Sequence, residues 1–317
     1  MRIAIYFTHK TIMKLSPITQ FFLFTAFLLT TIAGRQFTLT HYSPNLPSQA
    51  HFDGGRAFAD VEYQVSFGPR IPGTDGHRQT IEWIASELQK SGWDVEIQSG
   101  EMLNQKIFNV IGKRGGGGIS QGPWIVMGAH YDTRIYADKD PDPINQQKPV
   151  PGANDGASGV AVLLELARVL PVDLDKDVWL VFFDAEDNGN IPGWDWILGS
   201  RAFVQSLHEK PDAAIIVDMI GDADLGIYFE KNSDPEISAD IWAVADSLGY
   251  NQFIPAPKYG ILDDHTPFLE AGIRAVDIID FDYPYYHTIA DTPDKVSAES
   301  LKAVGETLRA WLLSSIP

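Results

Sequence analysis

Two short segments contain no polar side chain, and they constrain the fold more than any other feature of the chain. Residues 124–129 and 178–183 are rich in β-branched and aromatic residues, a composition typical of buried strands. A strand that is apolar at consecutive positions buries side chains on both faces of its sheet. The two segments therefore predict a central sheet that other elements cover on both faces.

Amphipathic segments with helical periodicity alternate with these and other strands. Further strands are predicted over residues 93–97, 107–111, 213–217, 227–229 and 275–279. Helices are predicted over residues 54–65, 75–91, 157–170, 200–208, 235–248, 266–271 and 298–313. Strands alternating with helices are typical of the α/β class. We therefore predict a three-layer α/β/α sandwich around a mostly parallel central sheet, forming a single catalytic domain over residues 54–317.

The first 34 residues have the pattern of an export signal. Arg2, Lys10 and Lys14 precede an apolar stretch over residues 21–33, which is too short to span a membrane comfortably. We expect an exported protein, whether secreted, periplasmic or at the cell surface, with residues 1–34 as a signal peptide. The alternative is an uncleaved N-terminal anchor, and any membrane anchoring is expected through this segment alone.

Two further expectations concern the same end of the chain. Met13 followed by Lys14 would begin a well-proportioned signal peptide, so both Met1 and Met13 are candidate start residues. Residues 35–53 are polar, contain Pro44 and Pro47, and are expected to form a linker to the domain.

Composition excludes several functional classes. The formal net charge of -18 argues against a nucleic-acid partner, because phosphate binding needs a basic surface. The same acidity suits substrates that carry a positive group such as a free amine. The chain has no cysteine, so thiolate metal sites, disulfides and a cysteine nucleophile are excluded. Any metal must be held by His, Asp and Glu.

Acidic and imidazole side chains follow the ends of the predicted strands. Glu186 and Asp187 come directly after the strand over 178–183, and two adjacent carboxylates repel each other unless a cation joins them. The carboxyl ends of parallel strands share one edge of the sheet, so groups placed there can converge. Such a set of ligands suits one or two zinc ions. The candidate residues are His130, Asp155, Glu186, Asp187, Asp218 and His287.

The order of these motifs resembles that of a known family, the zinc aminopeptidase and glutaminyl cyclase superfamily (metallopeptidase clan MH, family 28 of the metallo class). The resemblance covers roughly residues 54–314 and is most similar to the bacterial glutaminyl-cyclase-like branch. The motifs that carry it are His130-Tyr131-Asp132, Gly152-Ala153-Asn154-Asp155-Gly156-Ala157-Ser158-Gly159, Glu186-Asp187, Asp218, His287-Thr288 and Asp291-Thr292.

The resemblance implies a fold, a cofactor and a role for each candidate residue. The family has a phosphorylase/hydrolase-like α/β/α fold and binds zinc. Asp155 would be the central ligand that can bridge two ions, and Asp187 and His287 would bind one zinc. His130 and Asp218 would bind a second zinc if one is present. Glu186 would act as general base and acid.

Two reactions on peptides with a free N-terminus occur in this superfamily. A glutaminyl-peptide cyclotransferase converts N-terminal Gln to pyroglutamate and releases ammonia, with zinc polarising the side-chain amide and Glu186 shuttling the proton. An aminopeptidase hydrolyses the first peptide bond with water that the metal activates. A non-catalytic binding module with the same fold is a remote third hypothesis.

Several features favour the cyclotransferase-like function as the leading hypothesis and the aminopeptidase as the alternative. Asp263 opens a segment, Asp263 to Leu269, that resembles a cyclase motif, and it joins Glu186 and Asp218 as a candidate catalytic residue. Tyr286 before the last ligand and the Asn154–Gly159 motif are aminopeptidase-like. Aromatic residues are candidates to wall a pocket for a Gln side chain: Trp194, Trp196, Phe281, Tyr283 and Tyr286.

Overall fold

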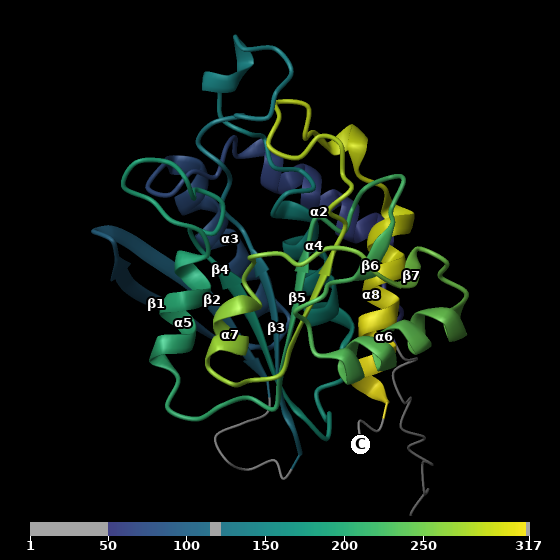
Figure 1. Ribbon diagram of the computed structural model, residues 1–317. Coiled ribbons are helices and arrows are strands. Elements are labelled where there is room, and N and C mark those ends of the chain that lie inside the picture. Colours follow the sequence, from purple (N-terminus) through teal and green to yellow (C-terminus); the bar gives the residue numbers. More distant parts are fainter. Residues whose placement is uncertain (1–49, 115–121, 315–317) are drawn as a thin grey trace, which may run out of the picture. The chain divides into compact units, whose positions relative to one another are not determined.

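The central sheet confirms the predicted architecture. The computed structural model describes residues 50–114 and 122–314, and those residues form a six-stranded sheet in the order β1-β2-β4-β3-β5-β8 (Figure 1). Strand β2 runs antiparallel to both of its neighbours, so the other strands all share one direction. The strands are β1 (Asp94–Met102), β2 (Gln105–Arg114), β3 (Trp124–His130), β4 (Asp177–Phe183), β5 (Ala213–Asp218) and β8 (Ala275–Ile279).

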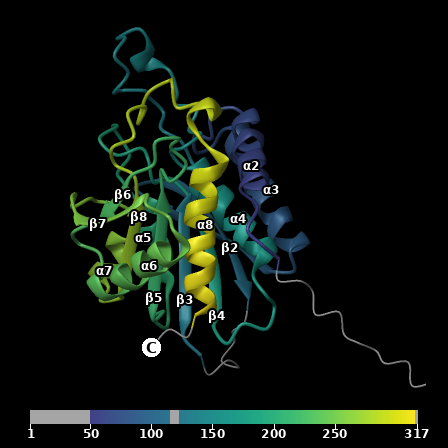
Figure 2. The same cartoon turned by 90° about the vertical axis from the view of Figure 1, so that its right-hand side faces the viewer.

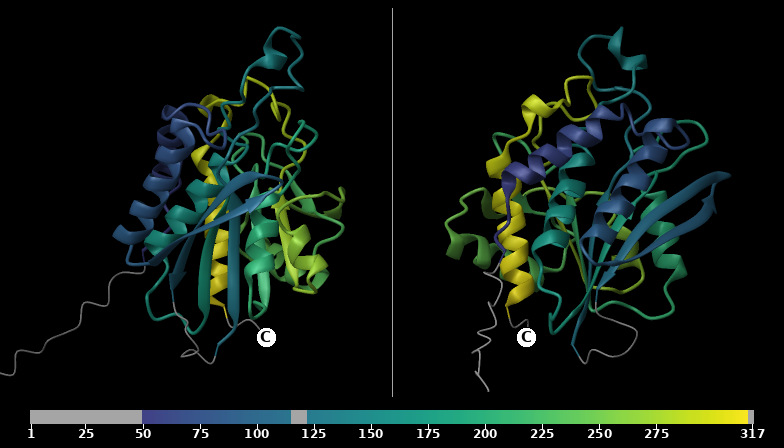
Figure 3. Two further views of the ribbon diagram at one scale, coloured as in Figure 1. Left: turned by 90° about the vertical axis from the view of Figure 1, so that its left-hand side faces the viewer. Right: turned by 180° about the vertical axis from the view of Figure 1, so that it is seen from behind.

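Helices cover both faces of this sheet and make the three layers. One face is covered by α2 (Gly54–Ser66), α3 (Asp75–Lys90), α4 (Ala157–Val169) and α8 (Ala298–Leu313), which lie in the foreground of the rear view in Figure 3. The other face is covered by α5 (Leu198–Ser206) and α7 (Thr266–Glu270). The central strands β3, β4, β5 and β8 are therefore covered on both faces, as their apolar sequences require, whereas the edge strand β1 stays largely exposed.

A smaller layer extends the fold beyond the β8 edge. Helix α6 (Pro235–Leu248) lies beside α8, and a parallel pair of short strands, β6 (Ile227–Phe229) and β7 (Phe253–Pro257), flanks it (Figure 2). Two short 3-10 helices, Asn145–Gln147 and Pro293–Lys295, lie in the loops above the sheet. Strand β7 is absent from the sequence-based prediction because it contains two prolines, which are uncommon in strands.

Alternation of side chains along the strands splits the core into two apolar layers. In β3, Ile125 and Met127 pack under the α4 and α8 layer, whereas Val126 packs under α5 and α7. Each of these three side chains is at most 1% exposed, which explains why the strand contains no polar residue before His130.

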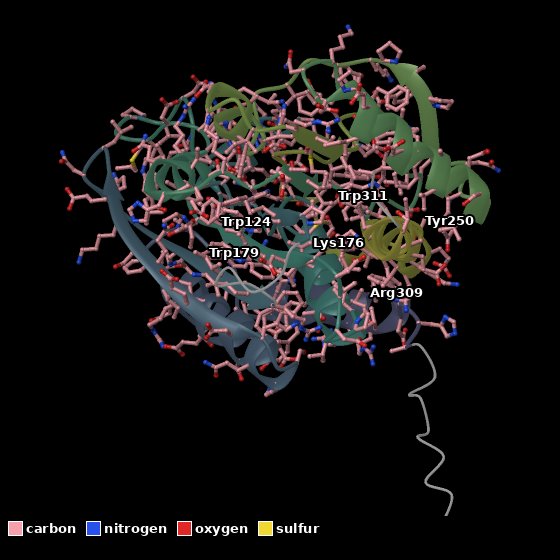
Figure 4. All side chains as sticks on the ribbon, turned by 90° about the horizontal axis from the view of Figure 1, so that it is seen from below. Trp124, Lys176, Trp179, Tyr250, Arg309 and Trp311 are labelled. Atoms are coloured by element: carbon pink, nitrogen blue, oxygen red, sulfur yellow. The ribbon has the colours of Figure 1, made fainter. Side chains whose placement is uncertain are left out.

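The amino ends and the carboxyl ends of the parallel strands form two opposite sides of the sheet, and different residues lie at each. At the amino ends of the parallel strands, seen from below in Figure 4, the rings of Trp124 and Trp179 lie 4.6 Å apart. Lys176 donates a hydrogen bond to the carbonyl of Ser314 nearby, which ties the end of α8 to this edge. The carboxyl edge instead carries the loops and the candidate site, as expected for open α/β sheets.

Some predictions concern residues outside the described part of the chain. The signal peptide or anchor over residues 1–34, the choice of start residue and most of the linker over 35–53 lie there and stay predictions. Helix α2 begins at Gly54, with the Asp53 side chain accepting a hydrogen bond from the Arg56 N–H as its N-cap. Across residues 50–114 and 122–314, no helix combines the length and the apolar character needed to cross a membrane.

Candidate metal centre

The carboxyl edge of the sheet brings all the predicted metal ligands together. His130 is the last residue of β3 and Asp218 the last of β5, while Asp187 lies in the turn just after β4. Asp155 lies in the turn before α4, and His287 lies in the loop after β8. Each of the five residues is at most 8% exposed. Groups from four strand ends and one helix start thus meet in a buried space.

The five ligands form two clusters that share Asp155. His130 Nε2 lies 3.1 Å from Asp218 Oδ1 and 3.2 Å from Asp155 Oδ1. On the other side, His287 Nε2 lies 2.7 Å from Asp187 Oδ1 and 3.6 Å from Asp155 Oδ2. The ligand atoms of each cluster lie within 4.8 Å of one another. Asp155 therefore presents one oxygen to each cluster, as a bridging ligand does.

These spacings and the unpaired atoms fit a divalent metal ion. Ligand atoms around a tetrahedral zinc, with bonds of about 2.0–2.1 Å, lie about 3.3 Å apart, which is close to the distances seen here. Asp155 Oδ2 and Asp187 Oδ2 are buried without a hydrogen-bond partner. Unpaired buried carboxylate oxygens are costly unless a cation neutralises them. Imidazole and carboxylate donors without sulfur are a suitable ligand set for zinc.

The same burial shifts the acid–base properties of the ligands. Burial raises the pKa of Asp187 to about 6 and that of Asp218 to about 7. Burial alone would lower the pKa of His287, but Asp187 and Asp138 outweigh it and raise that pKa to about 9. A divalent cation competes with these protons for the same nitrogen and oxygen atoms, so metal binding releases them.

Glu186 stands beside the ligands with the properties of a proton carrier. Its side chain lines the cavity above the clusters and is 8% exposed. Burial raises its pKa well above the ordinary range, and the charges of Asp263 and Asp187 add to that effect. A carboxyl group whose pKa is raised by burial holds a proton more firmly than an exposed one, which suits it to take up a proton and return it during a reaction.

Two carboxylates outside the predicted site hold its turns in place. Asp132 accepts hydrogen bonds from the N–H groups of Glu186 (2.9 Å) and Asp187 (3.3 Å), and its Oδ1 lies 3.5 Å from His130 Nδ1. Asp291 accepts hydrogen bonds from the N–H groups of Asn154 and Asp155. Both belong to motifs that the sequence resemblance rests on. The signal that could have found Asp132 is its position two residues after a histidine ligand.

A second pair, Arg134 and Asp138, supports His287 from the loop after β3. Asp138 Oδ1 lies 3.6 Å from His287 Nδ1, on the side of the ring that faces away from Asp187. Arg134 pairs with Asp138 at 2.5 Å and also donates a hydrogen bond to the carbonyl of Asp187. An orienting carboxylate on the free nitrogen is the usual support of a metal-binding histidine. Opposite charges four residues apart were the only sequence signal for this pair.

Backbone strain also gathers at this edge. Ala185, Met219 and His287 have positive φ angles of 51°, 47° and 55°, and each is a ligand or the neighbour of a site residue. Residues other than glycine adopt this conformation at a cost of roughly 1–2 kcal/mol each. Gly156 (φ 93°) lets its turn approach the ring of His130, because a Cβ there would lie 3.0 Å from that ring. These strained conformations lower the stability of the fold and set the directions of the side chains at the site.

A cavity of about 260 Å³ opens above the clusters, and only some of the predicted pocket residues line it. Trp196, Phe281 and Tyr286 line it together with Glu186 and Asp263. The Trp196 ring also stacks on that of His287, with an angle of 9° between the planes.

Two predicted aromatic residues lie away from this cavity. The structure places Trp194 against a separate apolar group around Ile107 and Leu198. Tyr283 points behind the site, where its hydroxyl donates to Asp291 at 2.7 Å. Sequence periodicity places no aromatic ring within a loop, so this difference could not be foreseen.

The protein is an α/β/α sandwich that carries buried His and Asp side chains and an adjacent glutamate at the carboxyl edge of its sheet. This combination is typical of metal-dependent enzymes. Comparison with family models matches residues 109–312 to Peptidase family M28. The chain belongs to this family, whose enzymes include aminopeptidases and glutaminyl cyclases. The family membership confirms the resemblance that the motifs predicted, and it implies zinc as the metal.

Individual relatives divide between the two activities. The chain is 27% identical over 306 residues to an aminopeptidase of Bacillus subtilis (YwaD), with 88% of this chain and 60% of the relative's length covered. The structure is similar to that of Tannerella forsythia glutaminyl cyclase, with 33% identity, a TM-score of 0.77 and coverage of 84% of this chain and 100% of that one.

A Zn-dependent exopeptidase from Parabacteroides distasonis is similar to nearly the same degree, with 30% identity, a TM-score of 0.76 and coverage of 84% of this chain and 100% of that one. The chain thus has structural relatives of both kinds, and the choice between them depends on its own residues.

Proposed function

We propose that this protein is a zinc-dependent glutaminyl-peptide cyclotransferase that acts on peptides with an N-terminal Gln. The observation that carries the proposal is the small cavity, in which Glu186 and Asp263 lie between the aromatic walls formed by Trp196, Phe281 and Tyr286. A short amide side chain and its own amine fit such a space. The two carboxyl groups provide a site for the protons that the reaction moves.

Asp155, Asp187 and His287 would hold one zinc ion, and His130 and Asp218 with Asp155 would hold a second. When bound, zinc would supply Lewis-acid polarisation of the side-chain amide carbonyl. The residues themselves hold the amide within the aromatic walls and bring the substrate amine close to Glu186. Since the attacking amine and the amide belong to one residue, the attack is intramolecular.

Glu186 carries the proton between the two nitrogens of the substrate. The amine nitrogen forms a bond to the side-chain carbonyl carbon and gives up a proton to the Glu186 carboxylate. The carbon–nitrogen bond of the amide then breaks, and Glu186 returns the proton to the departing nitrogen, which leaves as ammonia. Atoms and charge balance without water, and the raised pKa of Glu186 suits both transfers.

The aminopeptidase reaction is the second candidate, and one observation favours it. Two complete ligand clusters share Asp155, an arrangement suited to two ions that together activate water and stabilise the reaction at a peptide carbonyl. In that reaction Glu186 would take a proton from water and pass it to the leaving amine. The substrate class is again a peptide with a free N-terminus.

The two reactions differ in their products, so one pair of peptides separates them. Zinc-loaded protein is incubated with a Gln-initiated peptide and with a matched peptide that begins with Leu. We expect ammonia release from the Gln peptide without chain shortening and no change in the Leu peptide. Release of free amino acids from either peptide would instead establish the aminopeptidase. The E186Q variant serves as control for contaminating activity, because it should process neither peptide.

Export of the protein is part of the proposal. The motivating observation is the basic and apolar pattern of residues 1–34. Terminal sequencing of protein recovered from outside the cytoplasm should begin near residue 35, after the signal segment over residues 1–34. Recovery of the full-length chain from the membrane fraction would support the anchor instead.

A further inference from the structure

A third group of one histidine and two aspartates lies beneath the cavity wall, apart from the two clusters that share Asp155. Asp263 and His265 lie in the turn before α7, and Asp277 lies in the middle of β8. Their side chains are 3%, 0% and 0% exposed, and their ligand atoms lie within 4.8 Å of one another. The group repeats the composition of the other two clusters without sharing a residue with them.

The polar atoms of this group are buried and lack partners. Both ring nitrogens of His265, both carboxylate oxygens of Asp277 and Oδ2 of Asp263 have no hydrogen bond. A neutral imidazole has a donor and an acceptor nitrogen, and each is normally paired when buried. Asp277 is also a lone charged residue within the apolar strand Ala275–Ile279. Such a set of unpaired atoms indicates a ligand that bonds to several of them at once.

The orientation of His265 is that of a metal-binding histidine. Its Nδ1 lies 3.6 Å from Asp277 Oδ2, within the cluster, and its Nε2 lies 3.4 Å from Glu230 Oε2, outside it. Glu230 is itself held by hydrogen bonds from the N–H groups of Ser233 and Ile261. His130 and His287 show the same pattern, with one nitrogen in the cluster and the other facing an orienting carboxylate.

The excess of carboxyl groups around His265 also favours a bound cation. Asp264 lies next to Asp263, is fully buried, and has two oxygens without partners. Within residues 50–114 and 122–314, the ion pairs of Asp277 and Glu230 are formed with His265 alone. Burial, together with the charge of Asp263, raises the pKa of Asp277 well above its ordinary range. Several carboxyl groups thus surround a single imidazole. They hold protons where no cation is present, and a divalent ion that displaced those protons would balance their charges.

We propose that Asp263, His265 and Asp277 bind a third divalent cation of the zinc class, with Glu230 orienting His265. The ion is structural, because its ligands lie below the cavity rather than in it, apart from Asp263, which also lines the cavity. By fixing Asp263 from below, it holds that carboxyl group in the wall beside Glu186. The inference does not depend on which of the two reactions the enzyme catalyses.

Zinc-edge anomalous scattering from crystals of the full-length protein, prepared with zinc, tests the proposal without a variant. We expect a peak about 2.0–2.2 Å from His265 Nδ1 and from one oxygen each of Asp263 and Asp277, besides any peak at the Asp155 clusters. Absence of a peak between these three residues, in crystals that show zinc at Asp155, would overturn the proposal and leave shared protons as the explanation of the cluster.

Zinc content of variants provides an independent measurement. After saturation with zinc and dialysis, H265Q and D277N should each contain one zinc ion per chain less than the unmodified protein, as measured by elemental mass spectrometry. The matched control is H77Q, which alters a buried histidine outside the three clusters and should retain every ion. Equal zinc content in H265Q, D277N and the unmodified protein would contradict the proposal. If both variants fail to fold, the anomalous map decides.

Discussion

Two buried networks of His and Asp lie close together at the carboxyl edge, and they differ in one property. In the first, His77 Nε2 lies 2.8 Å from Asp184 Oδ1, and Asp184 Oδ2 accepts a hydrogen bond from the N–H of Phe108. The Tyr131 hydroxyl, 3.0 Å from His77, donates to the carbonyl of Phe108. Every side chain of this network has a protein partner, so it needs nothing from outside the chain.

The second network, centred on Asp155, also consists of buried His and Asp side chains but leaves oxygens of Asp155 and Asp187 unpaired. The comparison teaches that burial of His and Asp does not by itself indicate a metal site. Completeness of hydrogen bonding separates a structural network from a ligand set. The following predictions test that distinction, beginning with the largest expected effect.

Replacing Glu186 with Gln should lower kcat by about 10²–10⁴-fold, because the variant keeps the shape of the side chain but cannot carry a proton. Zinc content should be unchanged, since Glu186 belongs to neither cluster. Steady-state kinetics and elemental analysis of the same preparation measure both quantities. Turnover at the level of the unmodified enzyme would show that another group moves the proton.

Alanine at Asp184 should destabilise the protein by about 3 kcal/mol, because His77 and the Phe108 N–H lose a buried partner. The free energy of unfolding in urea measures this change, and zinc content should be unaffected.

Replacing Asp187 with Asn should have the opposite effects. The free energy of unfolding of the metal-stripped variant should fall by less than about 1 kcal/mol, but the variant should bind less zinc than the unmodified protein. Similar profiles for the two variants would abolish the distinction between the networks.

Alanine at Asp138 should weaken zinc binding by about 10–100-fold, because His287 loses the carboxylate that orients it. Competition with a coloured chelator measures the affinity. Asp142, an exposed residue of the same loop, provides the matched control, and D142A should bind zinc as the unmodified protein does. Equal affinities of the two variants would mean that Asp138 contributes nothing to the metal centre.

The smallest expected effect is the pH dependence of stability in metal-stripped protein. The pKa values of Asp187 and Asp218 are raised by burial to about 6 and about 7. A carboxyl group whose pKa is raised on folding contributes stability that is complete below its ordinary pKa of 3.8. This stability is lost progressively as pH rises from there through about 6 and about 7. We expect the melting temperature to fall by several degrees between pH 5 and pH 8.

Zinc should reverse this trend, because its ligands must be deprotonated to bind it. Melting curves with and without zinc should therefore differ more at pH 8 than at pH 5. A melting temperature of the metal-stripped protein that rises over this range would contradict the assigned pKa shifts.

The sequence alone predicted which candidate ligands converge better than it predicted the residues that support them, for a physical reason. Ligands such as His130 and Asp218 end parallel strands, and parallel strands share an edge whatever the details of packing. The role of Asp138 depends on how a long loop folds back over His287, which no periodicity encodes. The direction of the Trp194 ring and the pairing of the proline-containing strand β7 are likewise set by tertiary contacts.

Asp277 is a candidate ligand that the sequence pattern could have indicated. A single carboxylate inside an apolar strand indicates a buried charge that needs a partner. The strand itself was predicted over residues 275–279, and the structure confirms those bounds, but no role was predicted for Asp277. The neighbours of Asp277 come from the turn before α7, which meets β8 below the cavity only in the folded chain.

The most direct test of the account is the zinc content of a D155N variant, because Asp155 belongs to both of the ligand clusters that meet at the cavity. After saturation with zinc and dialysis, D155N should lose the zinc of both clusters, whereas D184N, which alters the fully paired network, should keep the content of the unmodified protein. Zinc content in D155N equal to that of the unmodified protein would contradict the assignment of Asp155 and of the metal centre built around it.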